Sequence, residues 1–286
     1  MIKTLNLGSL GHPNIPFDVA VTIAARNSFA AIDPDMGFLR QHAATHGAGA
    51  TRDWLAATGL QLGSMGLSVA WRDSDSDQAF TDSLISFRAD VALAAELDCS
   101  RCTTWVMPRS ESRDFYAHFD LVVPRLRQIA RLLGERGMRL GLEFVGPDTM
   151  RADRAFDFVH TLDGMRTLAA AIGSEFHNTG LLLDIFHWWV AHGTVTELKC
   201  LTARDIVYVH LNDAVAGRDR DQQIDQERDM VGMTGVLPVV QFMSALRAIG
   251  YLGPIAVEPF NAQVRAMTPD AAAALASTQL DKVLTI

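Results

Sequence analysis

Cysteine is scarce in this sequence, which limits the roles that thiols can have. Only three of the 286 residues are cysteine, and so few thiols fit a reducing compartment. Cys99 and Cys102 have the spacing of a redox or zinc pair, but no second pair exists and Cys200 stands alone. We therefore interpret Cys99 and Cys102 as incidental buried thiols rather than as a metal clip or a redox pair.

The sequence also lacks long apolar runs and an excess of basic residues. No stretch reaches the roughly 18 uninterrupted apolar residues of a membrane-spanning helix. The first residues do not show the charged, apolar and cleavage regions of a signal peptide, so we expect a cytoplasmic protein without membrane association. The formal net charge is −8, which disfavours nucleic acid because its binding depends on Lys and Arg that neutralise phosphates.

Length and residue pattern favour one α/β barrel. The chain is 49% hydrophobic, and a (β/α)8 barrel uses about 250 residues. Strand-like and helix-like segments alternate throughout, as in parallel β-α-β units. We predict an α/β fold, a single (β/α)8 TIM-barrel domain over residues 1–286. The expected strands cover residues 4–10, 30–32, 62–70, 102–107, 139–145, 181–186, 206–211 and 254–257. The expected helices cover residues 16–29, 38–60, 81–97, 115–135, 156–172, 195–201, 236–249 and 268 onward.

Four consecutive predicted strands carry an ionisable residue near the C-terminal end: Glu143, Asp184, His210 and Glu258. In a closed parallel barrel these ends surround one mouth, which is where such barrels carry active sites. Three carboxylates at one mouth would repel each other unless a cation neutralised them. Three oxygen donors and one imidazole suit one divalent ion, with Mn²⁺ favoured and Mg²⁺, Co²⁺ or Zn²⁺ open. The alternative is four buried polar groups with separate local partners.

The segments around these residues resemble a known family. The resemblance rests on Gly141-Leu-Glu143-Phe-Val-Gly-Pro147, Leu183-Asp-Ile-Phe-His187, Tyr208-Val-His210-Leu-Asn-Asp213 and Val257-Glu-Pro259. They are similar to the metal-site strands of xylose-isomerase-like barrels, in the sugar phosphate isomerase/epimerase branch. Arg228 and Val231-Gly-Met-Thr-Gly235 resemble the Arg and Pro-Gly-x-Gly loop of that branch, with Val231 in place of the proline. The motifs are most similar to those of inosose (keto-inositol) isomerases.

The resemblance implies roles for individual residues. The four strand-end residues would bind the metal, and His187 and Arg228 would hold substrate oxygens. Related ketose 3-epimerases often have a second glutamate where this chain has Thr149, which argues against that activity here. For His187 the alternative is a structural histidine, and for Arg228 it is a solvated charge. The charge run 219–229 is most simply a mobile solvated loop.

Three further residues stand at predicted strand exits. Trp71, Trp105 and His12 could form the wall of a pocket against the face of a sugar. Packing in the core or at the rim explains each of them equally well. They are therefore expected substrate-binding residues with an open alternative.

The expected chemistry is proton transfer next to a metal-bound carbonyl. A divalent ion stabilises the enediolate that forms when the adjacent carbon loses its proton, and Glu143 or Glu258 is the candidate base. The expected partner is a small polyol or sugar, with an inosose favoured, and the chain could form a homo-oligomer. The alternatives are dehydration of an inosose, 3-epimerisation of a ketose, an abasic-site endonuclease and a non-catalytic sugar-binding barrel.

Overall fold

A parallel sheet of nine strands forms the centre of the molecule. The computed structural model describes residues 1–152 and 156–286. Neighbouring strands of the sheet follow the order β3-β2-β1-β11-β10-β9-β7-β5-β4, and all these pairs are parallel. The strands are β1 (Ile2–Leu5), β2 (Ala31–Ile32), β3 (Gln61–Leu62), β4 (Met65–Gly66), β5 (Arg101–Val106), β7 (Arg139–Phe144), β9 (Thr179–Asp184), β10 (Ile206–Leu211) and β11 (Pro254–Val257).

The two edges of this sheet belong to one short stretch of chain. β3 pairs with β2 at one edge and β4 pairs with β5 at the other, and only Gly63 and Ser64 separate β3 from β4. Counted as one interrupted strand, β3 and β4 close the sheet into an eight-membered ring. The predicted (β/α)8 TIM barrel is confirmed, whereas the division of residues 1–286 into a single domain stays a prediction.

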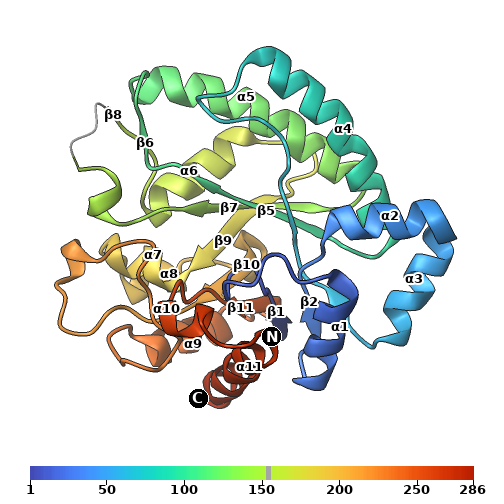
Figure 1. The fold of residues 1–286 in the computed structure, drawn as a ribbon. Coiled ribbons are helices and arrows are strands. Elements are labelled where there is room, and N and C mark those ends of the chain that lie inside the picture. Colours follow the sequence, from blue (N-terminus) through green and yellow to red (C-terminus); the bar gives the residue numbers. More distant parts are fainter. Residues whose placement is uncertain (153–155) are drawn as a thin grey trace.

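Helices surround the sheet on its outer side (Figure 1). A small antiparallel sheet of β6 (Arg109–Ser110) and β8 (Phe156–Asp157) lies apart from the barrel strands. No described helix is long and apolar enough to cross a membrane. The helices are α1 (Phe17–Arg26), α2 (Met36–His46), α3 (Ala48–Ala57), α4 (Asp77–Glu96), α5 (Phe115–Gly134), α6 (Leu162–Ile172), α7 (Ile185–Val190), α8 (Val195–Lys199), α9 (Val239–Ala248), α10 (Ala262–Arg265) and α11 (Pro269–Thr285).

Strand register decides which side chains point into the barrel. Successive side chains of a strand point to opposite faces, and directly paired residues share a face. His210 pairs with Asp184 on β9 and with Ala256 on β11, which places Glu258, two residues after Ala256, on the same face. Gly141 pairs with Gly180, so that Glu143 and Asp184 also face the interior. The period of two therefore brings the four ionisable strand ends to one face.

Several predicted boundaries were wrong, and local chemistry explains the shifts. The apolar run 181–186 stops being a strand at Asp184, because the Asp184 side chain accepts hydrogen bonds from the N–H groups of Phe186 and His187 and begins α7. The predicted helix 156–172 begins only at Leu162, behind the N-cap of Thr161. Its first residues instead form β8 against β6. Predicted strands 4–10 and 62–70 are shorter than expected, and the glycines after residue 46 divide the predicted helix 38–60 into α2 and α3.

Candidate metal centre at the carboxyl end of the barrel

Four side chains meet inside the barrel mouth. Glu143, Asp184, His210 and Glu258 each offer one ligand atom, and these atoms lie within 4.8 Å of one another. The Nδ1 atom of His210 lies 3.4 Å from Glu143 Oε1, 4.0 Å from Asp184 Oδ2 and 3.5 Å from Glu258 Oε2. Three of the four residues are buried, and Glu258 is nearly so. The structure thus brings together the four residues that the sequence predicted as metal ligands.

Two atoms of this cluster have no hydrogen-bond partner. Glu143 Oε1 and His210 Nδ1 lie 3.4 Å apart, and both are buried without a hydrogen-bond partner within the described structure. Buried polar atoms are normally paired, so unpaired ones at a common centre indicate a missing partner. The donor set, three carboxylates and one imidazole, is suited to a divalent transition ion or zinc. The residues therefore fit a metal ion.

The charge balance supports the same conclusion. Glu143, Asp184 and Glu258 are three acids, and Arg228 is the guanidinium that contacts two of them. With a neutral His210 the group would carry a net charge of −2, which is costly in a buried site. A divalent cation would offset this charge.

Without an ion, bound protons offset part of this negative charge. Burial raises the pKa of Glu143 to about 7. Burial alone would lower the pKa of His210, but Glu258 and Glu143 outweigh it and raise this pKa well above its ordinary value. Burial opposes ionisation of Glu258 as well, yet the charges of His210 and Arg228 lower its pKa to about 2. Metal binding must therefore release protons from this site.

Arg228 is part of the site and is not a solvated loop residue. Its guanidinium is about 1% exposed, and its Nη1 donates to Asp184 Oδ2 at 3.0 Å and to Glu258 Oε2 at 2.8 Å. The rings of Phe186 and Phe260 each lie 4.8 Å from the guanidinium carbon. The interpretation of Arg228 as a solvated charge was wrong, because carboxylates from two strand ends compensate its burial.

The charge run 219–229 is likewise more ordered than a solvated loop. Asp225 is largely buried and accepts a hydrogen bond from Arg228 Nη2 at 2.5 Å. Residues Arg220–Gln222 form a short 3-10 helix, and the Gln223 carbonyl accepts a hydrogen bond from Thr149. The prediction of a solvated loop was wrong for Asp225 and Arg228, which pair in a buried position, whereas Asp219, Asp221 and Glu227 are exposed as expected.

His187 lies next to Arg228 and is enclosed. Its side chain is 2% exposed, and its Nε2 accepts a hydrogen bond from Arg228 Nη2 at 3.0 Å. Burial and the positive charge of Arg228 lower the pKa of His187 to about 4, which keeps the ring neutral at pH 7. In this structure His187 supports Arg228, and its direct contact with a substrate stays a prediction.

The three residues at strand exits have different surroundings. Trp105 is 41% exposed and pairs in register with Glu143, so it stands at the mouth, with the Arg72 guanidinium carbon 3.8 Å from its ring centroid. Trp71 is only 2% exposed and belongs to the core. His12 lines a cavity that His210 also lines. Trp105 therefore stands exposed at the mouth and His12 beside the metal centre, whereas Trp71 packs in the core and lines another cavity. Contact with a substrate stays a prediction for all three.

Asp33 is an acid at the barrel mouth that was not among the predicted site residues. Asp33 follows the two-residue strand β2, in the same position that Glu258 has after β11. Its carboxylate accepts hydrogen bonds from the Tyr208 hydroxyl, Asn6 Nδ2 and the Ser64 N–H. Burial raises its pKa to about 6. The signal was present as an acid directly after a predicted strand, but that strand was too short to stand out.

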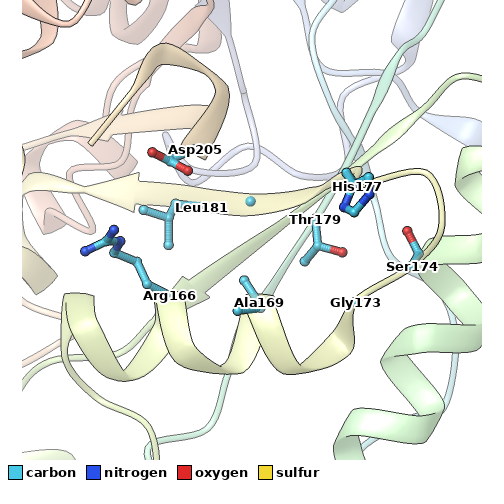
Figure 2. Close-up of a pocket in the computed structure, with 10 residues that line it drawn as sticks. Arg166, Ala169, Gly173, Ser174, His177, Thr179, Leu181 and Asp205 are labelled. Carbon is cyan, nitrogen blue, oxygen red and sulfur yellow. The ribbon is translucent and has the colours of Figure 1, made fainter. Parts of the chain in front are cut away.

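Another cavity lies at the amino ends of β9 and β10, opposite the metal centre, and Figure 2 shows the residues that line it. Its lining includes Thr179 and Gly180 at the start of β9, Asp205 just before β10, and Arg166 of α6. Active sites of such barrels form at the carboxyl ends of the strands. This cavity is therefore not part of the candidate metal centre.

The sequence of the barrel matches a described family. Residues 21–281 match the model of the xylose isomerase-like TIM barrel. The chain belongs to this family. Among solved structures, a xylose isomerase domain protein from Alicyclobacillus acidocaldarius is 28% identical with a TM-score of 0.86, over 99% of this chain and 97% of that one. The IOLI protein with a bound zinc atom shares the fold, with 17% identity and a TM-score of 0.82 over 100% and 98% of the two chains.

Curated relatives match over only part of their length. A 23S rRNA (uracil(1939)-C(5))-methyltransferase of Pseudomonas aeruginosa is 26% identical over 76% of this chain and 48% of that protein. The 3-dehydroshikimate dehydratase of Pseudomonas aeruginosa is 29% identical over 51% of this chain and 22% of that protein. The inosose isomerase of Halalkalibacterium halodurans is 25% identical over 48% of this chain and 44% of that protein. The chain thus spans about half or less of the length of these relatives.

Proposed function

We propose that this protein is a divalent-metal-dependent isomerase or epimerase that acts on a keto-polyol or sugar, with an inosose-type substrate favoured. The observation that carries the proposal is the cluster of three carboxylates and one imidazole at the carboxyl end of the barrel. Similarity to inosose isomerases over about half of the chain supports the choice of substrate. The net charge of −8 disfavours an RNA substrate of the kind named for the methyltransferase relative.

Glu143, Asp184, His210 and Glu258 would hold the ion, with Mn²⁺ favoured and Mg²⁺, Co²⁺ or Zn²⁺ compatible with the ligand set. When bound, a divalent ion polarises a carbonyl group and acidifies the neighbouring C–H. Asp184 is held in place from several sides: it caps α7 with Oδ1 and accepts from Asn212 and Arg228 with Oδ2. Because these partners fix its position, Asp184 is suited to a purely ligating role.

Glu143 and Glu258 are the two candidates for proton transfer. They lie on different strands and both approach His210 Nδ1, at 3.4 and 3.5 Å. A proton removed by one carboxylate can return to the neighbouring carbon, which gives isomerisation. It can also return to the opposite face of the same carbon, which gives epimerisation. Two carboxylates across one mouth are compatible with either outcome.

Arg228 would hold two of these carboxylates in fixed positions. It bridges Asp184 and Glu258 while Phe186 and Phe260 flank its guanidinium. A guanidinium is always charged and has a rigid set of donors, so it fixes the carboxylate geometry. All five N–H groups of Arg228 already donate, to Asp184, Glu258, His187 and Asp225, so the contact with a substrate oxygen that we propose for Arg228 requires the exchange of one of these bonds.

Deuterium exchange tests this function whichever net reaction follows the loss of the proton. The Mn²⁺-loaded protein is incubated in D₂O with a panel of inososes and ketoses, and proton NMR follows loss of the signal next to the carbonyl. We expect exchange with at least one inosose, and no exchange in chelator-treated protein. Absence of exchange across the panel, or full exchange without metal, would contradict the proposal.

Dehydration is the second candidate, because a 3-dehydroshikimate dehydratase is among the relatives. The same proton removal would then be followed by loss of a β-hydroxyl group. The mass of the product separates the two reactions, since dehydration removes one water and isomerisation leaves the mass unchanged.

A further inference from the structure

A cavity of about 300 Å³ lies beside the metal centre, in the half of the barrel that supplies no ligand. Its lining includes Asn6, His12 and Asp33 from the ends of β1 and β2, and His210 from the metal cluster. A ligand in this cavity would therefore touch the metal centre at one side and the first strands at the other. The volume suits a single six-membered ring that carries hydroxyl groups.

Asp33 is fixed in this cavity by strong local bonds. Its Oδ1 accepts from the Ser64 N–H at 2.9 Å, its Oδ2 accepts from Asn6 Nδ2 at 2.9 Å, and the Tyr208 hydroxyl lies 3.0 Å from both oxygens. A carboxylate offers about four acceptor positions, and one hydroxyl can donate only one proton at a time. One acceptor position therefore remains, and the side chain is only half-buried.

A short hydrogen-bonded path connects Asp33 with a candidate base. Asn6 donates to Asp33, and its Oδ1 accepts from the Ser9 N–H at 3.0 Å. The Ser9 hydroxyl donates in turn to Glu258 Oε1 at 3.5 Å. A ligand held by Asp33 would thus have a fixed position relative to Glu258, one of the two candidate bases.

The charges in the cavity decide which ligands it accepts. Its described lining includes two carboxylates, Asp33 and Asp35, and no Lys or Arg. An anionic ligand would face repulsion here, and like charges in a partly desolvated pocket are costly. Hydroxyl groups would instead find the free acceptor position of Asp33.

We infer that this cavity binds the part of the substrate remote from the reacting carbons, and that Asp33 selects an uncharged polyol over a phosphorylated or carboxylated one. The inference rests on the proposed function and specifies its substrate class. On this basis the cavity would accept a neutral inosose and disfavour a carboxylated substrate of the kind that the name 3-dehydroshikimate dehydratase implies.

The test uses ligands that cannot react. Calorimetry measures the dissociation constants of myo-inositol and of myo-inositol monophosphate for the Mn²⁺-loaded protein and its variants. Any contact between phosphate and the ion is common to all variants, so the ratio of the two constants isolates the effect of Asp33. We expect Asp33→Asn to shift this ratio at least tenfold toward the phosphate.

Asp35→Asn is the matched control. It removes the same charge from the same cavity, but Asp35 is exposed and accepts from the Phe38 N–H as the N-cap of α2, so water screens its charge. We expect its ratio to change less than twofold. An unchanged ratio in folded Asp33→Asn, or an equal shift in Asp35→Asn, would overturn the inference.

A steric variant keeps the inference testable if Asp33→Asn does not fold. Gly66 lines the cavity, and a Cβ there would meet no atom within 4 Å. Gly66→Leu would occupy the space without disturbing Asp33, and we expect it to weaken inositol binding at least tenfold. Undiminished inositol binding would show that the ligand lies elsewhere. Since inositol cannot enolise, these results are independent of the deuterium exchange that tests the function.

Discussion

The two halves of the barrel mouth place polar side chains at equivalent positions and use them differently. In the half formed by β7, β9, β10 and β11, Glu143 and His210 have atoms without a partner. In the half formed by β1 to β5, Asp33 is bonded to Asn6 and Ser64 and to Tyr208 of β10. Strand ends therefore determine where polar groups gather, whereas local hydrogen-bond partners determine whether those groups are free to bind a cation or a hydroxyl group.

Removal of the ion should have the largest effect, because it acts only on the ligand-bearing half. We expect dialysis against a chelator to abolish exchange activity and Mn²⁺ or Co²⁺ to restore it. The pKa values of Glu143 and His210 are raised without metal, so both hold protons that the ion must displace. Apparent metal affinity, measured by titration calorimetry, should therefore fall as the pH falls below about 7. Affinity that is constant between pH 6 and 8 would contradict this.

Glu258→Gln should reduce the exchange rate by about 10²- to 10⁴-fold, the usual contribution of a positioned acid or base. The amide keeps the shape of the side chain but cannot accept a proton. Exchange rates at saturating Mn²⁺ separate this effect from weaker metal binding. Glu96→Gln, an exposed glutamate on α4, is the matched control and should leave the rate unchanged. A wild-type rate in Glu258→Gln would remove this residue from the proposed mechanism.

Arg228→Met tests the electrostatic difference between the halves. Loss of the guanidinium leaves Asp184 and Glu258 buried without their cation, and loss of one partner of a buried pair costs about 3–5 kcal/mol. We expect a lower free energy of unfolding in urea for the metal-free variant, with partial recovery when Mn²⁺ is added. Arg218→Met, which breaks a more exposed ion pair with Glu227, should cost less than about 1 kcal/mol. Equal losses in the two variants would argue against a special role for Arg228.

Gly63→Ala should give the smallest effect of these changes, a loss of stability in the half of the barrel that contains Asp33. A Cβ at Gly63 would overlap Asp33 Oδ1 and approach the Thr4 side chain, whereas one at Gly66 would meet nothing within 4 Å. We expect Gly63→Ala to lower the free energy of unfolding by about 1–3 kcal/mol, as overpacking does, and Gly66→Ala to be close to neutral. Denaturant titration measures both. Equal stability of the two variants would mean that Asp33 is not tightly held.

The ligand-bearing half could be predicted well from the sequence because its strands are long and apolar. The predicted bounds of β10 and β11 match the structure, and each strand ends beside an ionisable residue. Asp33 was missed since β2 has only two residues and gives no periodic signal. Arg228 was assigned two roles because its partners, Asp184 and Glu258, are 44 and 30 residues away along the chain. Contacts between residues so far apart in the sequence depend on the tertiary structure and cannot be predicted from a local sequence pattern.

The hydroxyl of Tyr208 ties β10 to β2 across the inside of the barrel, two residues before His210, and its ring lies edge-on against the imidazole at 5.4 Å. Because Tyr208 contacts both Asp33 and His210, we expect a ligand bound at Asp33 to restrict the movement of the His210 imidazole as well. Binding of a polyol at Asp33 should thus increase the affinity for the ion, and by thermodynamic linkage the ion must increase the affinity for the polyol by the same factor. The cation and the polyol would then bind cooperatively.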